Sequence, residues 1–136
     1  MIIDTPPALG ILTVNALTAS NKCIIPAQPA PYSLDGIKQL YSTIQTIWKY
    51  TNKDLQIAGI LLTRYSSRAV INREIAQMLE QSAKEMGSKL FNVKIRECIS
   101  IKEAQAMKQD IFTYAPRCNA SIDYKALVEE VIGDER

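Results

Sequence analysis

The segment from Leu55 to Thr63 (LQIAGILLT) is apolar at almost every position and restricts the possible fold more than any other part of the chain. A strand of this composition is buried on both faces, as in a parallel sheet that helices cover from both sides. The flanking stretches are typical of such helices, because their apolar residues recur three and four positions apart. These residues are Ile37, Leu40, Tyr41, Ile44, Ile47 and Trp48 before the strand and Ile71, Ile75, Met78 and Leu79 after it. The alternation predicts an α/β fold made of right-handed crossovers.

Three further strands are expected, which gives a parallel sheet of about four strands. Ile2-Ile3 is interpreted as the end of a buried strand that the following prolines terminate. Cys23 to Pro26 is a second short apolar strand, and Leu90 to Ile95 is a more polar one that is expected near an edge of the sheet. Residues 1–136 are expected to form a single domain, because the chain is 47% hydrophobic and long enough for one core.

Helices are expected around these strands, over residues 8–17, 34–48, 71–86 and 101–107 and in the C-terminal segment. Ser33 and Ser121 are suitable N-caps, and Gly87 and Gly133 suit the C-terminal ends of helices, where glycine is common. The buried side of the last helix is expected to consist of Ile122, Leu127, Val128 and Val131.

The charge of the chain is concentrated in its middle third. The net charge is only +2, which by itself implies neither a nucleic acid nor an anionic membrane as partner. Residues 64–108, however, carry nine basic and five acidic side chains. This excess is consistent with a surface that faces DNA, but a basic stretch of this kind is more often an ordinary solvated surface.

The three cysteines, Cys23, Cys98 and Cys118, are far apart in the sequence, and the chain contains no histidine. No pair of cysteines has the spacing of a zinc site, so we expect reduced thiols, as in a cytosolic protein. No apolar run approaches the roughly 18 residues of a membrane span, and no signal peptide is recognisable at the N-terminus. We therefore expect a cytoplasmic protein with no membrane partner.

Five motifs in a fixed order carry a resemblance to a known family. They are IIDTPP, IIPAQPAPYSLDG, GILLTRYSSR, IKEA and YAP, and an amphipathic C-terminal helix follows them. This order resembles the ParA/Soj group of partition ATPases, in the MinD/ParA superfamily. The resemblance covers essentially the whole chain and corresponds to the C-terminal half of these proteins. It implies a partial P-loop NTPase-like sheet with flanking helices, although the glycine-rich P-loop itself is absent from the 136 residues.

The resemblance also implies positions for a nucleotide and its metal. Asp4 resembles the Walker B carboxylate that supports Mg²⁺, and Thr5, Pro6 and Pro7 resemble the switch that senses the γ-phosphate. Thr63 and Arg64 match the positions that contact the adenine base. From the residues alone, the alternatives are that Asp4 is an ordinary strand-terminal aspartate that caps the next helix, and that Arg64 simply begins a surface loop.

Two interaction surfaces follow from the same resemblance. Arg68 matches a basic residue used for sequence-independent DNA binding, and Arg73, Lys94, Arg96, Lys102 and Lys108 could extend this patch. A second arginine of the family's DNA surface is Ser100 in this chain. Gln28, Pro29 and Tyr32 match a segment of the family's dimer interface, although a rigid loop leading into a helix explains the same prolines.

The resemblance implies a role in plasmid or chromosome partitioning. In that family, ATP and Mg²⁺ hold a dimer on DNA, and a centromere-binding ParB-like protein stimulates hydrolysis. We therefore expect non-specific DNA and a ParB-like protein as partners, a homo-oligomer, and association with the nucleoid. Without a P-loop, this chain alone is expected to bind neither ATP nor Mg²⁺ and to lack ATPase activity. The alternative is a nucleotide-incompetent module that binds DNA or a full-length ParA.

Overall fold

The computed structural model describes residues 1–6 and 8–133. The elements are α1 (Ile11–Ala19), β1 (Lys22–Ala27), α2 (Pro31–Tyr50), β2 (Gln56–Leu62), α3 (Val70–Glu85), α4 (Ile99–Ala106), α5 (Ile111–Tyr114) and α6 (Asn119–Gly133). β1 and β2 pair in parallel, and α2 forms the crossover between them. The predicted α/β class, with a parallel sheet and flanking helices, is confirmed. The expected number of about four strands is wrong, because the sheet in the described residues has two.

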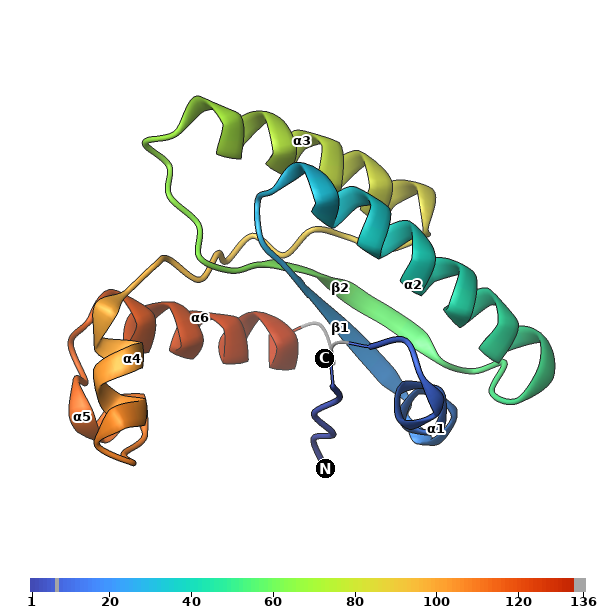
Figure 1. Ribbon diagram of the computed structural model, residues 1–136, viewed down its shortest axis with the longest axis horizontal. Coiled ribbons are helices and arrows are strands. Elements are labelled where there is room, and N and C mark those ends of the chain that lie inside the picture. Colours follow the sequence, from blue (N-terminus) through green and yellow to red (C-terminus); the bar gives the residue numbers. More distant parts are fainter. Residues whose placement is uncertain (7, 134–136) are drawn as a thin grey trace.

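The sheet lies between two helical layers (Figure 1). On one face, α2 and α3 cover the larger core, in which Ile44, Ile60, Leu62 and Leu79 are fully buried. On the other face, α6 and residues 90–95 enclose a smaller core of Leu61, Phe91 and Ile95. α4 and α5 lie at one end of the molecule, beside the start of α6 (Figure 1). Helices therefore cover both faces of β2, as its continuous apolar sequence predicts.

The Phe91 ring packs on the backbone of β2 at Gly59, where the register of the strand changes. Cys23 pairs with Ile57, whereas the next residue, Ile24, pairs with Gly59, so one residue of β2 is left over. A Cβ atom at position 59 would lie only 2.6 Å from Cε2 of Phe91. The missing side chain at Gly59 therefore makes room for Phe91, which is 1% exposed.

The segment predicted as a strand from Leu90 to Ile95 pairs with β2 only at isolated points. Leu90 bridges to Ile60, and Arg96 bridges to Tyr65, both in parallel. The Ile95 N–H donates to the Leu62 carbonyl at 2.8 Å. The segment runs beside β2 in the expected place, but the prediction of a regular strand is wrong.

Carboxylates on α6 account for this interruption. Glu130 accepts hydrogen bonds from the backbone N–H groups of Asn92 and Val93 at 2.9 and 3.0 Å. Asp123 accepts one from the backbone N–H of Arg96 at 2.9 Å. These carboxylates thus accept hydrogen bonds that the carbonyl groups of a neighbouring strand would otherwise accept. The segment is thereby fixed to α6 instead of extending the sheet.

The N-terminal prediction is also wrong, because residues 1–6 form no strand. Ile2 is 98% exposed and Ile3 is 41% exposed. A short apolar segment forms a strand only where a neighbouring strand supplies hydrogen-bond partners. In the described residues β1 pairs only with β2, and Figure 1 shows the N-terminal segment extending away from the sheet.

Two helix starts differ from the predictions. α2 begins at Pro31, with Ala30 as its N-cap, so Ser33 already lies inside the helix. Proline suits the first turn because its fixed φ is helical and its missing N–H is not needed there. Ser121 lies inside α6, where its hydroxyl donates to the Ala115 carbonyl at 2.7 Å. The predicted end of α3 is confirmed, since Gly87 follows the helix with a φ of 68°.

Four apolar residues predicted to be buried are about half exposed, namely Ile71, Met78, Ile122 and Val128. On α6 the stripe that faces the core contains Ala120, Tyr124, Leu127 and Val131, spaced by four, three and four residues. Small alanines, absent from the prediction, take buried positions on α3 at Ala76 and Ala83. None of the helices in the described part of the chain is both long and apolar enough to cross a membrane.

Candidate functional site

The carboxyl ends of β1 and β2 lie side by side. The Thr63 backbone N–H donates to the Ala27 carbonyl at 2.9 Å, and the Thr63 hydroxyl donates to the same oxygen at 3.4 Å. In open α/β sheets, ligands bind in the crevice beyond the carboxyl ends of the strands. Two hollows lie near this edge, one following each strand.

The basic hollow follows β2 and has a volume of about 570 Å³. It is lined by Tyr65, Ser66, Ser67, Arg68, Lys94, Arg96, Glu97 and Asn119. Three segments build it: the loop after β2, the segment beside β2, and the first residue of α6. Its lining contains three cationic side chains and one carboxylate, so the hollow is suited to an anion.

Neighbouring groups position the charges of the basic hollow. The Lys94 Nζ lies 4.7 Å from the centroid of the Tyr65 ring, within the range of a cation–π contact. The Glu97 carboxylate pairs with Arg64 at 3.1 Å, which offsets the negative charge on this side. Arg64 has a φ of 50°, so the chain turns sharply at the end of β2. Arg68 follows on the same loop and is exposed to solvent.

Arg96 is bound to α6 through Asp123. Its Nη2 lies 2.6 Å from Oδ1 and its Nε lies 3.0 Å from Oδ2. Burial raises the pKa of the Asp123 carboxyl, but the hydrogen bonds and charge of Arg96 outweigh burial and lower it. Hydrogen bonding to Asp123 in turn raises the pKa of Arg96. Arg96 therefore lines the hollow with a charge that Asp123 largely compensates.

The structure brings together part of the predicted DNA-binding set. Arg68 and Arg96 line the basic hollow, and so does Lys94. Arg73 lies on α3 and Lys102 on α4, where both are exposed outside the lining of this hollow. Whether any of these side chains contacts DNA stays a prediction.

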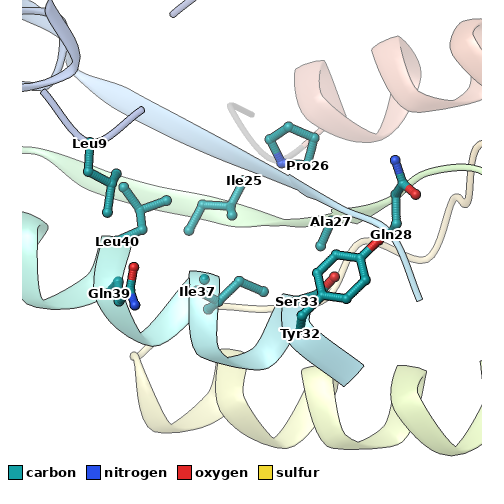
Figure 2. Close-up of a pocket in the computed structure, with 11 residues that line it drawn as sticks. Leu9, Ile25, Pro26, Ala27, Gln28, Tyr32, Ser33, Ile37, Gln39 and Leu40 are labelled. Atoms are coloured by element: carbon teal, nitrogen blue, oxygen red, sulfur yellow. The ribbon is translucent and has the colours of Figure 1, made fainter. Parts of the chain in front are cut away.

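A second, more apolar hollow of about 360 Å³ lies between the end of β1 and the start of α2. Figure 2 shows Gln28 and Tyr32 at one end of it, with Ile25, Ile37 and Leu40 along its wall. Tyr32 is 70% exposed, and Pro29 is half-buried in the intervening loop. Gln28, Pro29 and Tyr32 thus lie close together at the surface, as a contact region requires, and their role in a dimer stays a prediction.

The residues predicted to hold a nucleotide and its metal do not form one site. Asp4, Thr5 and Pro6 lie in the exposed N-terminal segment, which Figure 1 shows apart from the loop after β2. Pro7 lies outside the described residues. Thr63 is half-buried, and Arg64 is engaged with Glu97.

Within residues 1–6 and 8–133, no group of three or more cysteine, aspartate or glutamate side chains could hold a metal ion. Mg²⁺ is bound through carboxylates together with the phosphates of its nucleotide. The arrangement of the described residues does not fit Mg-ATP.

The motifs did not point to Asp123 and Glu130, the two carboxylates that hold α6 against residues 92–96. A sequence signal for them exists, since they are seven residues apart and so share one helix face. That face also contains Leu127, which packs on the smaller core.

Comparison with known proteins gives relatives along almost the whole chain. Residues 1–57 match the AAA_31 family model, described as an AAA domain. The sporulation initiation inhibitor protein Soj of Bacillus subtilis is 37% identical over 131 residues, which are 96% of this chain and 51% of Soj. The chromosome partitioning protein ParA of Caulobacter vibrioides is 32% identical over 136 residues, which are 100% of this chain and 50% of ParA. The chain therefore spans about half the length of these curated relatives.

Solved structures share part of the fold. Cobyrinic acid a,c-diamide synthase from Mycobacterium smegmatis, with bound ADP and magnesium, matches with a TM-score of 0.53 and 37% identity. The match covers 57% of this chain and 32% of the synthase. Another structure of the same enzyme gives a TM-score of 0.55 over 60% of the chain.

Proposed function

This chain is related along almost its whole length to the Soj and ParA chromosome-partitioning proteins, and from that relationship we propose that it acts in DNA segregation as a ParA-like protein. In this role the basic hollow binds the phosphate backbone of DNA. The observation that carries the proposal is the convergence of Arg68, Lys94 and Arg96 at the carboxyl end of β2. These three cations come from sequence positions up to 28 residues apart, so the fold assembles them.

The chemistry of the hollow suits phosphate better than bases. Arginine and lysine bind phosphate oxygens through charge-assisted hydrogen bonds, and such contacts carry no sequence information. Ser66 and Ser67 add hydroxyl groups beside Arg68, and the Asn119 amide offers further donors. The aromatic ring in the lining, Tyr65, is 9% exposed and is covered by Lys94, so it is not free to stack on a base. DNA binding is therefore independent of sequence.

The three cations have different roles in this proposal. Arg68 is exposed on a loop and makes the principal phosphate contact. Lys94 is half-buried and held over Tyr65, so its charge is fixed at the side of the hollow. Arg96 is the positioning residue, because its guanidinium fixes α6 and with it Asn119.

We also propose a dimer contact, a cellular location and a protein partner. Gln28, Pro29 and Tyr32 contribute to a contact between two copies of the chain, and DNA binding localises the protein to the nucleoid in the cytoplasm. A ParB-like protein acts as a partner. ATP and Mg²⁺ belong to the reaction of longer relatives, and residues 1–136 alone do not bind them.

A binding assay with two unrelated duplexes tests the function. Fluorescence anisotropy with labelled DNA of equal length and different sequence should give equal affinities for the chain. The affinities should fall together as NaCl rises, because phosphate contacts release condensed counterions. No binding at low salt, or a strong preference for one duplex, contradicts the proposal.

A further inference from the structure

Two cysteines lie at the amino-terminal ends of two helices beside the basic hollow. Cys98 is the N-cap residue of α4, and Cys118 directly precedes α6. The Cys118 sulfur caps α6, because it accepts a hydrogen bond from the Ser121 backbone N–H at 3.4 Å. It also lies 3.5 Å from the Ser121 hydroxyl oxygen. Both cysteines are partly exposed, so reagents can reach them.

The surroundings of Cys118 favour its reactive thiolate form. Burial raises the pKa of the Cys118 thiol, but hydrogen bonds from Ser121, the Cys98 thiol and the Ala120 backbone outweigh burial and lower it. Glu97 and Asn119, which adjoin Cys98 and Cys118 in the chain, line the same hollow, so the fold brings the two cysteines to one region, where the Cys98 side chain interacts with Cys118. The Arg96 guanidinium is within electrostatic reach of Cys98. A thiolate at a helix N-terminus is a usual setting of a reactive cysteine.

The third cysteine has the opposite environment. Cys23 lies on β1 and packs against the larger core. Burial raises the pKa of its thiol, which disfavours the thiolate. Cys23 is therefore an internal control for reactivity within the same chain.

We propose that Cys98 and Cys118 form a redox-sensitive dithiol that closes to an intramolecular disulfide when the protein meets a hydroperoxide. The Cys118 thiolate attacks one oxygen of the peroxide and becomes a sulfenic acid, while the other oxygen leaves as water or an alcohol. The Cys98 thiol then attacks the Cys118 sulfur, and the sulfenic oxygen leaves as water. The two thiols are oxidised by two electrons, and the peroxide is reduced by the same two.

The disulfide would join two walls of the basic hollow. Glu97 immediately precedes Cys98, Asn119 immediately follows Cys118, and both line that hollow. A covalent link between the starts of α4 and α6 therefore restricts the positions of Glu97 and Asn119 in the hollow. This regulatory consequence rests on the proposed DNA binding, whereas formation of the disulfide does not.

Peptide mapping of the full chain tests the dithiol. The reduced protein is treated with hydrogen peroxide, its free thiols are alkylated, and it is digested with trypsin without reduction. Cleavage after lysine and arginine places Cys98 in the peptide Glu97 to Lys102, Cys118 in Cys118 to Lys125, and Cys23 in Cys23 to Lys38. We expect the first two peptides to be recovered as one disulfide-linked species, with Cys23 alkylated. Recovery of all three as separately alkylated peptides overturns the proposal, as does equal oxidation of Cys23.

Serine variants separate the chemistry from a fold defect, since serine is itself a good N-cap. Cys98→Ser should lose the linked species and leave a sulfenic acid on Cys118 that dimedone traps, whereas Cys23→Ser should behave like the unchanged chain. A linked species that persists at the same yield in Cys23→Ser and is absent from Cys98→Ser supports the proposal.

DNA titration of the reduced and oxidised chain tests the regulatory consequence. A severalfold change in affinity supports it, and identical affinities overturn it. Failure of the reduced chain to bind DNA contradicts the proposed function and leaves the dithiol result standing.

Discussion

The Asp123 carboxylate binds both the guanidinium and the backbone N–H of Arg96, at 2.6 Å from Oδ1 to Nη2 and 2.9 Å from Oδ2 to the backbone nitrogen. One side chain of α6 thus fixes the segment beside β2 and the side chain that lines the basic hollow. Glu130, two turns later on α6, accepts hydrogen bonds from the backbone N–H groups of Asn92 and Val93 in a similar way. The smaller core depends on this pair of carboxylates as well as on its apolar contacts.

Replacing Asp123 should destabilise the fold in a pH-dependent way. The pKa of Asp123 is lowered in the folded state, so its contribution is fully present above the unfolded-state pKa of about 3.9 and is lost as pH falls below it. Asp123→Asn should reduce the free energy of unfolding by about 2 kcal/mol at neutral pH. As the pH falls below ~4, through the lowered folded-state pKa of Asp123, the stabilities of the variant and the unchanged chain should approach each other. Urea unfolding followed by circular dichroism at several pH values measures this.

Asp54→Asn is the matched control for this prediction, because Asp54 is exposed in the turn before β2. It should change stability by less than about 0.5 kcal/mol at either pH. A loss that is equal for the two variants would contradict a special role for Asp123.

Gly59→Ala should destabilise the protein because the new Cβ collides with the smaller core. That atom would lie 2.6 and 2.9 Å from two carbons of the Phe91 ring and 3.1 Å from the Lys89 carbonyl oxygen. Since Phe91 is fully buried, the ring cannot move aside, and we expect a loss of about 1–3 kcal/mol. Gly36→Ala is the control, because its Cβ meets open space on α2. Gly36→Ala should increase the free energy of unfolding by about 0.5–1 kcal/mol. Thermal unfolding measures both variants, and equal changes in stability at the two positions would contradict the collision with Phe91.

The purified 136-residue chain should not hydrolyse ATP in the presence of Mg²⁺. The described residues bring neither Asp4 nor a phosphate-binding loop to Thr63 and Arg64, and phosphoryl transfer depends on positioning and charge neutralisation. Phosphate release measured with and without EDTA checks this. Release that depends on Mg²⁺ and on protein concentration would contradict the prediction.

The elements predicted well are those whose signal is local. The apolar stripe of α2 and the continuous apolar run of β2 are periodic over many residues, so each predicts its own burial. The segment from Leu90 to Ile95 has a similar local signal, but two of its backbone N–H groups, those of Asn92 and Val93, are bound by Glu130, up to 38 residues away. The local pattern of apolar residues gives no information about a partner so far along the chain. The sequence therefore predicts a regular strand where the structure has two isolated bridges, Leu90 to Ile60 and Arg96 to Tyr65.

In the candidate site, too, features with a local signal were predictable and features that depend on distant contacts were not. The position of Arg68, just beyond the carboxyl end of a buried strand, follows from topology, and the structure places it in the hollow as a lining residue. The compensation of Arg96 by Asp123 depends on a contact 27 residues apart, which no motif contains. Asp4 follows the strand predicted at Ile2-Ile3, and the described residues provide no neighbour for that strand.

The salt dependence of DNA binding by Arg68→Ala tests the central claim most directly. Lys53→Ala is the matched control, because it removes the same charge from an exposed turn at the opposite end of β2. In anisotropy titrations over a series of NaCl concentrations, Arg68→Ala should weaken binding severalfold. It should also reduce the slope of log K against log salt by about one, while Lys53→Ala should change neither. An unchanged slope for Arg68→Ala, or the same change for both variants, would contradict phosphate binding at the basic hollow.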